Sequence, residues 1–428
     1  MLRRVFGIVV FALFLVSPFL VSPSSAVEIG AVLRKIDVEK QVAFVFANGQ
    51  ERTIKIAADT KVKDEKGETL SDGLSAKELK EGTTLTISVD FNGKAPTIAA
   101  IRLGGKLATN TKPNGSDTPS VGKASVGKVS VGKPSLGFKP LTEMTVEDRY
   151  KGEDGGLYGA GQNDPPELLK AAATKVSENI VPRDADGVPT ANGTIGLVSI
   201  SMSNATQEYA RFKQIADADN AKSPLVNIVD CAQGGQTMAR WADPKAACWV
   251  EADHRLKSAG VSLNQVQVAW IKLANAGPNG ELYEHGKQLD QDTRTVLSNI
   301  TSHFPNLRIV YLGSRIYGGY ADGRLNPEPY AYEGAFVCRW LIQSQMKGDA
   351  ELNYDPDRGQ VKSPLLLWGP YLWADGMTPR TADKLVWERD DLVTDGTHPS
   401  NSGRQKVAEQ LLTFFKTDAN ARTWYVKK

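Results

Sequence analysis

A chain of 428 residues with a formal charge of only +2 is long enough for one large domain and a small one. Such a balanced charge gives no strong field to attract nucleic acid or an anionic membrane, so neither is expected as a partner. The four histidines are scattered at positions 254, 285, 303 and 398, a spacing that offers no metal-ligand cluster.

Residues 1–26 have the pattern of a secretory signal peptide. A basic start is followed by an apolar run over residues 5–21, and Ser24 and Ala26 supply small residues at the cleavage positions. The run is short for a membrane span, and no later segment is apolar for long enough to cross a bilayer. We therefore expect a secreted, periplasmic or cell-surface protein without an integral span once the signal is removed.

The three cysteines, Cys231, Cys248 and Cys338, are an odd number for a protein in an oxidising compartment. This count predicts one disulfide and one buried free thiol, and proximity in the sequence favours Cys231 with Cys248 as the pair. Three buried thiols are the alternative.

Residues 27–104 alternate apolar and polar side chains in the manner of strands. The expected strands cover residues 31–36, 42–47, 52–56, 84–89 and 97–103, with a short helix near 75–81. They predict a small all-β, barrel-like domain similar to an OB-fold. Because this segment has no Cys, His or Trp, it is a poor candidate for nucleophilic chemistry. We expect a binding or spacer module, whose partner the sequence does not identify.

Residues 105–140 have the composition of a linker, rich in Gly, Ser and Pro. Ser-Val-Gly-Lys occurs at 120–123, 125–128 and 130–133, and a decayed copy, Ser-Leu-Gly-Phe, follows at 135–138. We interpret this basic segment as a solvated spacer that its charge keeps extended. An electrostatic tether to an acidic surface or polysaccharide is the alternative.

Residues 141–428 contain all eight Trp and all four His, and strand-like runs alternate there with helical patterns. Strands are expected at 195–200, 225–229, 266–273, 307–312 and 365–368, and helices at 205–216, 287–303, 334–346 and 402–416. Continuous apolar strands between helices predict an α/β domain with a parallel sheet covered on both faces. Ligands bind such sheets beyond the carboxyl ends of the strands.

The segment Asp395-Gly-Thr-His398-Pro stands just before the last predicted helix. An Asp three residues before a His can hold the imidazole in one tautomer, which leaves the other ring nitrogen free to take a proton. Asp and His near a helix start also serve as caps, so the pair has catalytic meaning only together with a nucleophile from elsewhere in the chain.

Three predicted strands end in residues that could complete such a site. Ser203 lies at a strand-to-helix turn, where a hydroxyl is exposed and the backbone N–H lies at the positive end of the helix. Gly235 follows the second strand, and its N–H could point at an oxyanion, as could the side-chain amide of Asn275 after the third strand. Taken alone, Ser203 could be an N-cap, Gly235 is better explained by a plain tight turn, and Asn275 could be a turn residue.

Together, Ser, Gly, Asn and Asp-x-x-His in this order resemble the SGNH (GDSL-type) hydrolase and esterase superfamily over roughly residues 190–417. The resemblance implies a three-layer, flavodoxin-like α/β fold with helices on both faces of a parallel sheet. It implies Ser203 as nucleophile, His398 as base and Asp395 as its partner, with Ser203, Gly235 and Asn275 forming the oxyanion hole. The implied reaction is acyl transfer to water, which needs no metal or organic cofactor.

Two blocks depart from the family pattern. The first usually reads Gly-Asp-Ser and here reads Ser-Met-Ser, whereas the third usually reads Gly-x-Asn-Asp and here reads Leu-Ala-Asn-Ala. The nucleophile could then be Ser201, although strand alternation and the helix start favour Ser203, and Gly234 could replace Gly235. The alternative function is a catalytically degenerate, secreted protein of the same fold that binds carbohydrate or a surface.

Two loops that follow predicted strands, 315–320 and 368–373, carry aromatic and polar side chains. Flat aromatic groups with polar neighbours can stack on sugar rings, and they pack equally well in a core. The candidate substrate contacts are Arg315, Tyr317, Trp368, Tyr371 and Trp373. With export and a spacer, these loops fit an esterase that removes acyl groups, such as acetyl, from a carbohydrate polymer. The expected partner is then an acylated polysaccharide.

Overall fold

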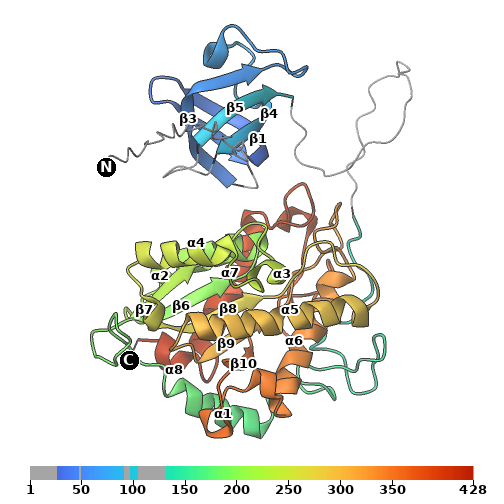
Figure 1. Cartoon of the computed structure of the whole chain (residues 1–428). Coiled ribbons are helices and arrows are strands. Elements are labelled where there is room, and N and C mark those ends of the chain that lie inside the picture. Colours follow the sequence, from blue (N-terminus) through green and yellow to red (C-terminus); the bar gives the residue numbers. More distant parts are fainter. Residues whose placement is uncertain (1–26, 48–49, 91–96, 105–131, 428) are drawn as a thin grey trace, which may run out of the picture. The chain divides into compact units, whose positions relative to one another are not determined.

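The computed structural model describes residues 27–47, 50–90, 97–104 and 132–427, which form two compact units (Figure 1). The predicted signal peptide and the first two Ser-Val-Gly-Lys copies lie outside the described residues. None of the helices in these described ranges is both long and apolar enough to cross a membrane.

The first unit is a closed barrel of five strands in the order β1-β2-β3-β5-β4. The strands are β1 (Val27–Asp37), β2 (Val42–Ala47), β3 (Gln50–Lys63), β4 (Thr84–Asp90) and β5 (Thr97–Leu103). The third strand is longer than predicted, because a register shift between Ile56 and Lys61 bends it and lets it pair with both β2 and β5. The predicted short helix is only a 3-10 turn, η1 (Gly73–Ser75).

The second unit is an α/β domain around five parallel strands in the order β10-β9-β8-β6-β7. These are β6 (Ile195–Ile200), β7 (Val226–Asp230), β8 (Val266–Lys272), β9 (Ile309–Gly313) and β10 (Leu365–Trp368). Counted along the chain from β6, the order is 2-1-3-4-5, which is the order of flavodoxin-like sheets. Strand β7 lies on one side of β6, and β8, which follows in the chain, lies on the other side. A crevice is therefore expected beyond the carboxyl end of β6.

Eight α-helices of the described second unit surround this sheet (Figure 1). They are α1 (Glu167–Ser177), α2 (Ser203–Asp217), α3 (Met238–Trp241), α4 (Ala247–Ser258), α5 (Leu282–His303), α6 (Tyr330–Met346), α7 (Asn401–Thr417) and α8 (Arg422–Tyr425). Short 3-10 turns lie at Leu263–Gln265, Ala350–Leu352, Pro356–Arg358 and Arg389–Asp391. Helix α2 packs against α7, and α5 packs against α6 and α3.

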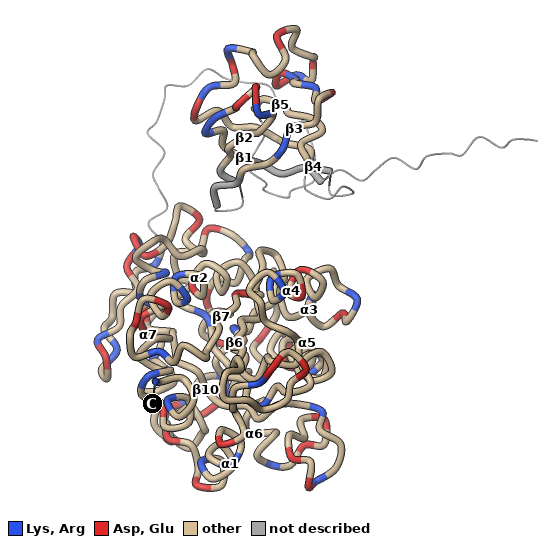
Figure 2. The backbone as a smooth tube through the Cα atoms, turned by 90° about the vertical axis from the view of Figure 1, so that its left-hand side faces the viewer, with Lys and Arg blue, Asp and Glu red and all other residues tan. Residues whose placement is uncertain are grey.

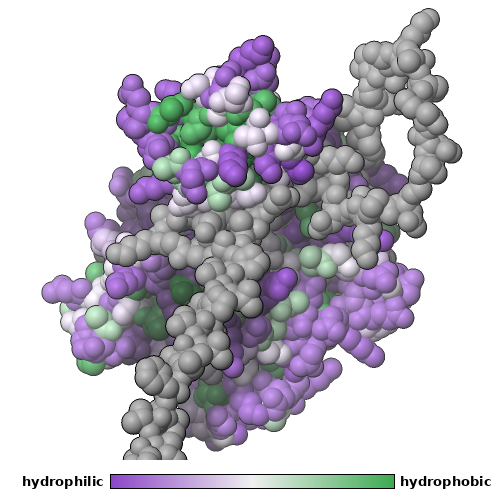
Figure 3. Space-filling view, turned by 45° about the horizontal axis from the view of Figure 1, so that its top comes forward, coloured by the Kyte–Doolittle hydropathy of each residue, from purple (hydrophilic) through white to green (hydrophobic). Residues whose placement is uncertain are grey.

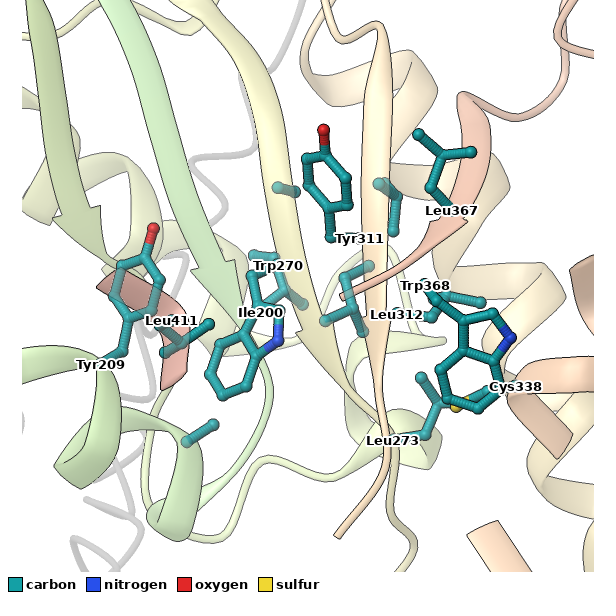
Figure 4. Packing of buried hydrophobic residues seen from close by; sticks show 14 of the residues in the cluster. Ile200, Tyr209, Trp270, Leu273, Tyr311, Leu312, Cys338, Leu367, Trp368 and Leu411 are labelled. Carbon is teal, nitrogen blue, oxygen red and sulfur yellow. The ribbon is translucent and has the colours of Figure 1, made fainter. Parts of the chain in front are cut away.

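The core of the second unit is built around the buried side chains of its strands. Every residue of β6, β8, β9 and β10 is buried, which explains their continuous apolar sequences. Tyr209 of α2 stacks on Trp270 of β8 with the ring centres 5.7 Å apart, and Tyr311 of β9 meets Phe415 of α7 edge-on at 5.7 Å. Figure 4 shows Tyr209, Trp270 and Tyr311 among the packed side chains. This rigid sheet holds the loops that leave its carboxyl edge.

Acidic and basic residues are interspersed along the backbone of both units, in line with the small net charge (Figure 2). Figure 3 shows a mostly hydrophilic face with one apolar area on the first unit, and Val38 and Phe44 are exposed large apolar residues of that unit.

The predicted linker ends earlier than residue 140, because its decayed repeat copy is packed onto the second unit. The backbone N–H groups of Leu136 and Gly137 each donate to the Asp375 carboxylate at 2.8 Å. Phe138 replaces the lysine of the other copies, and its ring lies 5.4 Å from Tyr150 and 5.1 Å from Tyr332. An aromatic side chain at this repeat position supplies the apolar anchor that a lysine lacks.

The predicted disulfide between Cys231 and Cys248 is wrong, since all three cysteines are buried free thiols. The Gln233 side chain links the backbones of the two cysteines. The Gln233 side-chain amide donates to the carbonyl of Cys231 at 3.1 Å and to that of Cys248 at 2.8 Å. The buried thiols therefore serve as small apolar side chains.

Candidate active site

Ser203, His398 and Asp395 meet beyond the carboxyl end of β6. The Ser203 hydroxyl oxygen lies 2.8 Å from Nε2 of His398, and Nδ1 of the same ring lies 2.6 Å from a carboxylate oxygen of Asp395. A hydroxyl, an imidazole and a carboxylate linked in this order can pass a proton from the hydroxyl to the ring while the carboxylate orients it.

The position of Ser203 follows from the start of α2. Met202 is the N-cap with an extended backbone, so Ser203 is the first helical residue, and its N–H has no partner inside the helix. That N–H lies at the positive end of the helix, where negative charge is stabilised. The Ser203 side chain is partly exposed. This geometry presents both a hydroxyl and a free N–H to a ligand.

Ser201, the alternative nucleophile, lies inside the domain. It is fully buried, and its hydroxyl donates to the backbone carbonyl of Lys272 at the end of β8. A hydroxyl that is committed to a backbone carbonyl and shielded from solvent cannot meet a substrate. The structure thus brings Ser203, and not Ser201, to His398.

The loop that carries Asp395 and His398 is fixed on several sides. The Val393 N–H donates to the His398 carbonyl at 2.9 Å, and the side-chain amide of Asn204 donates to the Thr397 carbonyl at 2.8 Å. Gly396 has φ +63°, and a Cβ there would lie 1.7 Å from the Tyr320 carbonyl oxygen. Only glycine fits this turn, so the Gly of Asp-Gly-Thr-His is required by the close approach of the chain.

Hydrogen bonds keep Asp395 ionised beside the imidazole. Burial by itself would raise the pKa of this carboxyl, but the His398 ring and the N–H groups of His398 and Thr397 lower the pKa below its ordinary value. Both N–H groups donate to the same carboxylate oxygen at 2.9 Å, which leaves the other oxygen for the ring. The negative carboxylate can then stabilise a protonated imidazole.

Gly235 lies in the turn that follows β7, with φ +78° and open space around it. Both Gly235 and Gly234 are exposed, and among the described residues neither hydrogen-bonds to Ser203. The turn is tied to β6 by the Gln233 N–H, which donates to the Ser201 carbonyl at 3.0 Å. The turn therefore lies at the same edge of the sheet as Ser203.

Asn275 follows β8 and has its side chain fixed on both sides. Its carbonyl oxygen accepts the Ala239 N–H at 2.9 Å, and its amide nitrogen donates to the Asp292 carboxylate at 2.6 Å. An amide group has two N–H donors, so one remains uncommitted. Sequence reasoning missed Asp292, although it falls on one face of α5 with His285 and Gln288 at the helical spacing that a polar stripe would show.

A cavity of about 570 Å³ opens beside Asn275. Its lining includes the polar or charged residues Arg240, Asn275, Glu284, His285, Asp292 and Tyr330. Within the parts of the chain that the structure describes, no group of three or more His, Cys, Asp and Glu could hold a metal ion. These side chains offer hydrogen-bond donors and acceptors to the cavity.

No protein-family model and no curated protein matches this chain. Among solved structures, it is similar to a Bacteroides fragilis protein provisionally named an acylhydrolase, with a TM-score of 0.33, 12% identity and coverage of 61% of this chain and 100% of that one. It is also similar to a Streptococcus pneumoniae protein provisionally named a platelet activating factor, with a TM-score of 0.31, 13% identity and coverage of 57% and 92%. Escherichia coli CusF has a TM-score of 0.15, 16% identity and coverage of 20% and 95%. Similarities this distant carry no information about function.

All five predicted substrate contacts, Arg315 included, are buried, and the prediction of a stacking surface is wrong for the aromatic residues Tyr317, Trp368, Tyr371 and Trp373. Their exposed fractions are 1%, 5%, 6% and 0%. Their polar atoms bond within the fold: the Tyr317 hydroxyl to the Lys133 carbonyl, Trp368 Nε1 to the Leu157 carbonyl, the Tyr371 hydroxyl to the Leu141 N–H and Trp373 Nε1 to Glu328. The loops after β9 and β10 fold inward, because their aromatic rings gain more from packing than from exposure.

Proposed function

We propose that this chain is a serine esterase of the SGNH (GDSL-type) kind that hydrolyses short acyl esters, such as acetyl esters. The observation that carries the proposal is the continuous hydrogen-bonded series from Ser203 through His398 to Asp395 at the carboxyl edge of a parallel sheet. The 2-1-3-4-5 strand order, with buried side chains on both faces of the strands, supports the three-layer flavodoxin-like arrangement.

The proposed reaction begins when His398 takes the hydroxyl proton of Ser203 as its oxygen attacks the ester carbonyl. The imidazolium that forms is held by Asp395 and then protonates the leaving alcohol. Water, activated by the same imidazole, attacks the acyl-enzyme and regenerates Ser203. All proton transfers pass through Nε2, the ring nitrogen that lies 2.8 Å from the hydroxyl.

The oxyanion would be stabilised by the N–H groups of Ser203 and Gly235 and by the free amide N–H of Asn275. Among the described residues, neither backbone N–H has a hydrogen-bond acceptor. The Asn275 amide is held in place by Asp292 and Ala239, so it needs no reorganisation when charge develops. Removing one such donor typically costs about 10²–10³-fold in turnover.

We further propose that the substrate is an acylated carbohydrate and that the protein reaches it by export. The polar residues in the lining of the cavity beside Asn275 support a hydrophilic substrate, and the composition of residues 1–26 supports export. The four buried aromatic residues give this part of the proposal no support.

The proposal is tested by treating the purified full chain with a fluorophosphonate probe. We expect the wild type to be labelled, Ser203→Ala and His398→Ala to lose labelling, and Ser201→Ala, the matched control, to keep it. If the folded wild type is not labelled, the esterase proposal is wrong, and the alternative, a carbohydrate- or surface-binding protein of the same fold, becomes the better explanation.

A further inference from the structure

Arg315 is a buried arginine with no hydrogen-bond partner among the residues that the structure describes. It lies two residues beyond the end of β9, and only 4% of its surface is exposed. Its Nε atom is sealed from solvent and has no acceptor among the described residues. A guanidinium carries five N–H donors, and proteins rarely bury such a group without using them.

Strand register places Arg315 at the edge of the sheet that carries Ser203. Gly313 is paired with Lys272, whose carbonyl accepts the hydroxyl of Ser201. Arg315 lies two residues past Gly313, as Ser203 lies two residues past Ser201. The guanidinium is also within electrostatic reach of Asp395, the carboxylate that orients His398.

The acidic neighbours of Arg315 are satisfied by other donors. Glu208 accepts two bonds from Lys272, at 2.6 and 2.7 Å. Glu328 accepts bonds from Trp373 Nε1, the Gly318 N–H and the Tyr332 N–H, at 2.7, 2.8 and 2.9 Å.

Asp395 is likewise satisfied, since it accepts bonds from the His398 ring and from two backbone N–H groups. The three carboxylates thus attract the guanidinium without occupying its donors. The guanidinium donors of Arg315 are therefore available to bind a ligand.

We propose that Arg315 binds a carboxylate of the substrate, so that the preferred substrate is an acyl ester of an acidic sugar. This inference rests on the proposed esterase function and specifies its substrate class. The planar guanidinium matches a carboxylate through two parallel N–H bonds, which gives orientation as well as attraction. A carboxylate bound beside the triad would hold the ester against Ser203.

The test compares two substrates that differ in one group, O-acetyl glucuronate and O-acetyl glucose, with the full chain. We expect wild-type kcat/KM to be about 10- to 100-fold higher for the acidic ester, as a hydrogen bond to a charged group allows. In Arg315→Met this ratio should fall toward one, and in Arg315→Lys, which keeps the charge without the planar fork, it should be intermediate. A wild-type ratio near one, or equal losses on both esters in Arg315→Met, would overturn the inference.

Two further measurements keep the outcome clear. Free glucuronate should inhibit hydrolysis of a neutral aryl acetate by the wild type more strongly than glucose does, and this result does not depend on the folding of any variant. Equal inhibition would count against Arg315 as the carboxylate site, as would stronger inhibition by a sulfated sugar. Fluorophosphonate labelling separates the two proposals, because a labelled wild type without acidic preference retains the esterase function and loses only the inference.

Discussion

The side-chain amide of Asn275 donates to the carboxylate of Asp292, with 2.6 Å between the nitrogen and the oxygen. Asp292 lies on α5, so a helix of the second unit sets the orientation of a side chain that follows β8. The other oxygen of Asp292 accepts a bond from Gln288 at 2.9 Å. Asp292 is therefore a positioning residue, which acts on the proposed oxyanion hole through Asn275.

Replacing Asp292 with Ala should lower kcat by about 10-fold with little change in KM, because a loosened Asn275 amide loses part of its transition-state stabilisation. Asn275→Ala should lower kcat by about 10²–10³-fold, and the double variant should be no worse than Asn275→Ala alone. Steady-state kinetics on an aryl acetate measures all three variants. Gln288→Ala is the matched control, since it removes a bond to Asp292 but none to Asn275. Multiplying losses in the double variant would show that Asp292 acts independently of Asn275.

Asp395→Asn should lower kcat by about 10⁴-fold, because an amide cannot hold the imidazole in the required tautomer or stabilise its protonated form. The backbone N–H groups of Thr397 and His398 can still donate to the Asn side-chain oxygen, so the loop should keep its fold. Circular dichroism and kcat measured on the same sample check both points. A folded Asp395→Asn protein with wild-type kcat would remove Asp395 from the triad.

Lys272 and Glu208 form an ion pair with no exposed surface on either side chain. Removing one partner leaves an uncompensated buried charge, so Lys272→Met should destabilise the second unit by about 3–5 kcal/mol. Replacing both, as Lys272→Met with Glu208→Leu, should restore much of that loss. Denaturant unfolding followed by Trp fluorescence measures this, since all eight Trp lie in residues 141–428. A double variant as unstable as the single one would contradict the compensation.

The strands of the second unit could be predicted closely, because burial on both faces leaves an apolar run in the sequence. The run at 225–229 corresponds to β7 at Val226–Asp230, and the helix expected at 402–416 is α7 at Asn401–Thr417. Helix α5 was predicted five residues too short, at 287–303 against Leu282–His303. Its start is set by a capping box between Glu281 and Glu284. Glu is an unusual N-cap residue, so the sequence did not indicate this start of the helix.

The grouping of Ser203, Asp395 and His398 could be predicted, because Ser203 follows a strand and the other two residues stand just before the last helix. The Asn275–Asp292 contact could not, because it joins two elements whose relative position is set by packing. Burial of the aromatic loops could not be predicted from the sequence either, because the same rings suit a core and a sugar-binding surface. The periodicity of apolar residues predicts one helix or strand at a time. It does not show which residues of another helix or strand pack against it.

Glu328 should make the stability of the second unit fall as the pH rises. Burial raises the pKa of this carboxyl from 4.5 to about 7, although three N–H donors and the Arg315 charge oppose the shift. The folded state therefore binds more protons than the unfolded state between these values. The contribution of Glu328 to the free energy of unfolding is fully present below pH 4.5 and decreases as the pH rises toward about 7. It does not change further above that range.

Glu328→Gln removes this titration, so the free energy of unfolding should depend less on pH between 5 and 8 than in the wild type. Unfolding by denaturant, followed by Trp fluorescence at several pH values in that range, measures the difference. Glu167→Gln is the control, because the Glu167 side chain is 87% exposed and its replacement should leave the wild-type pH dependence in place. If Glu328→Gln kept the full wild-type slope, a different buried group would have to carry it, and Asp230, whose pKa is raised by burial to about 6, would be the next to replace.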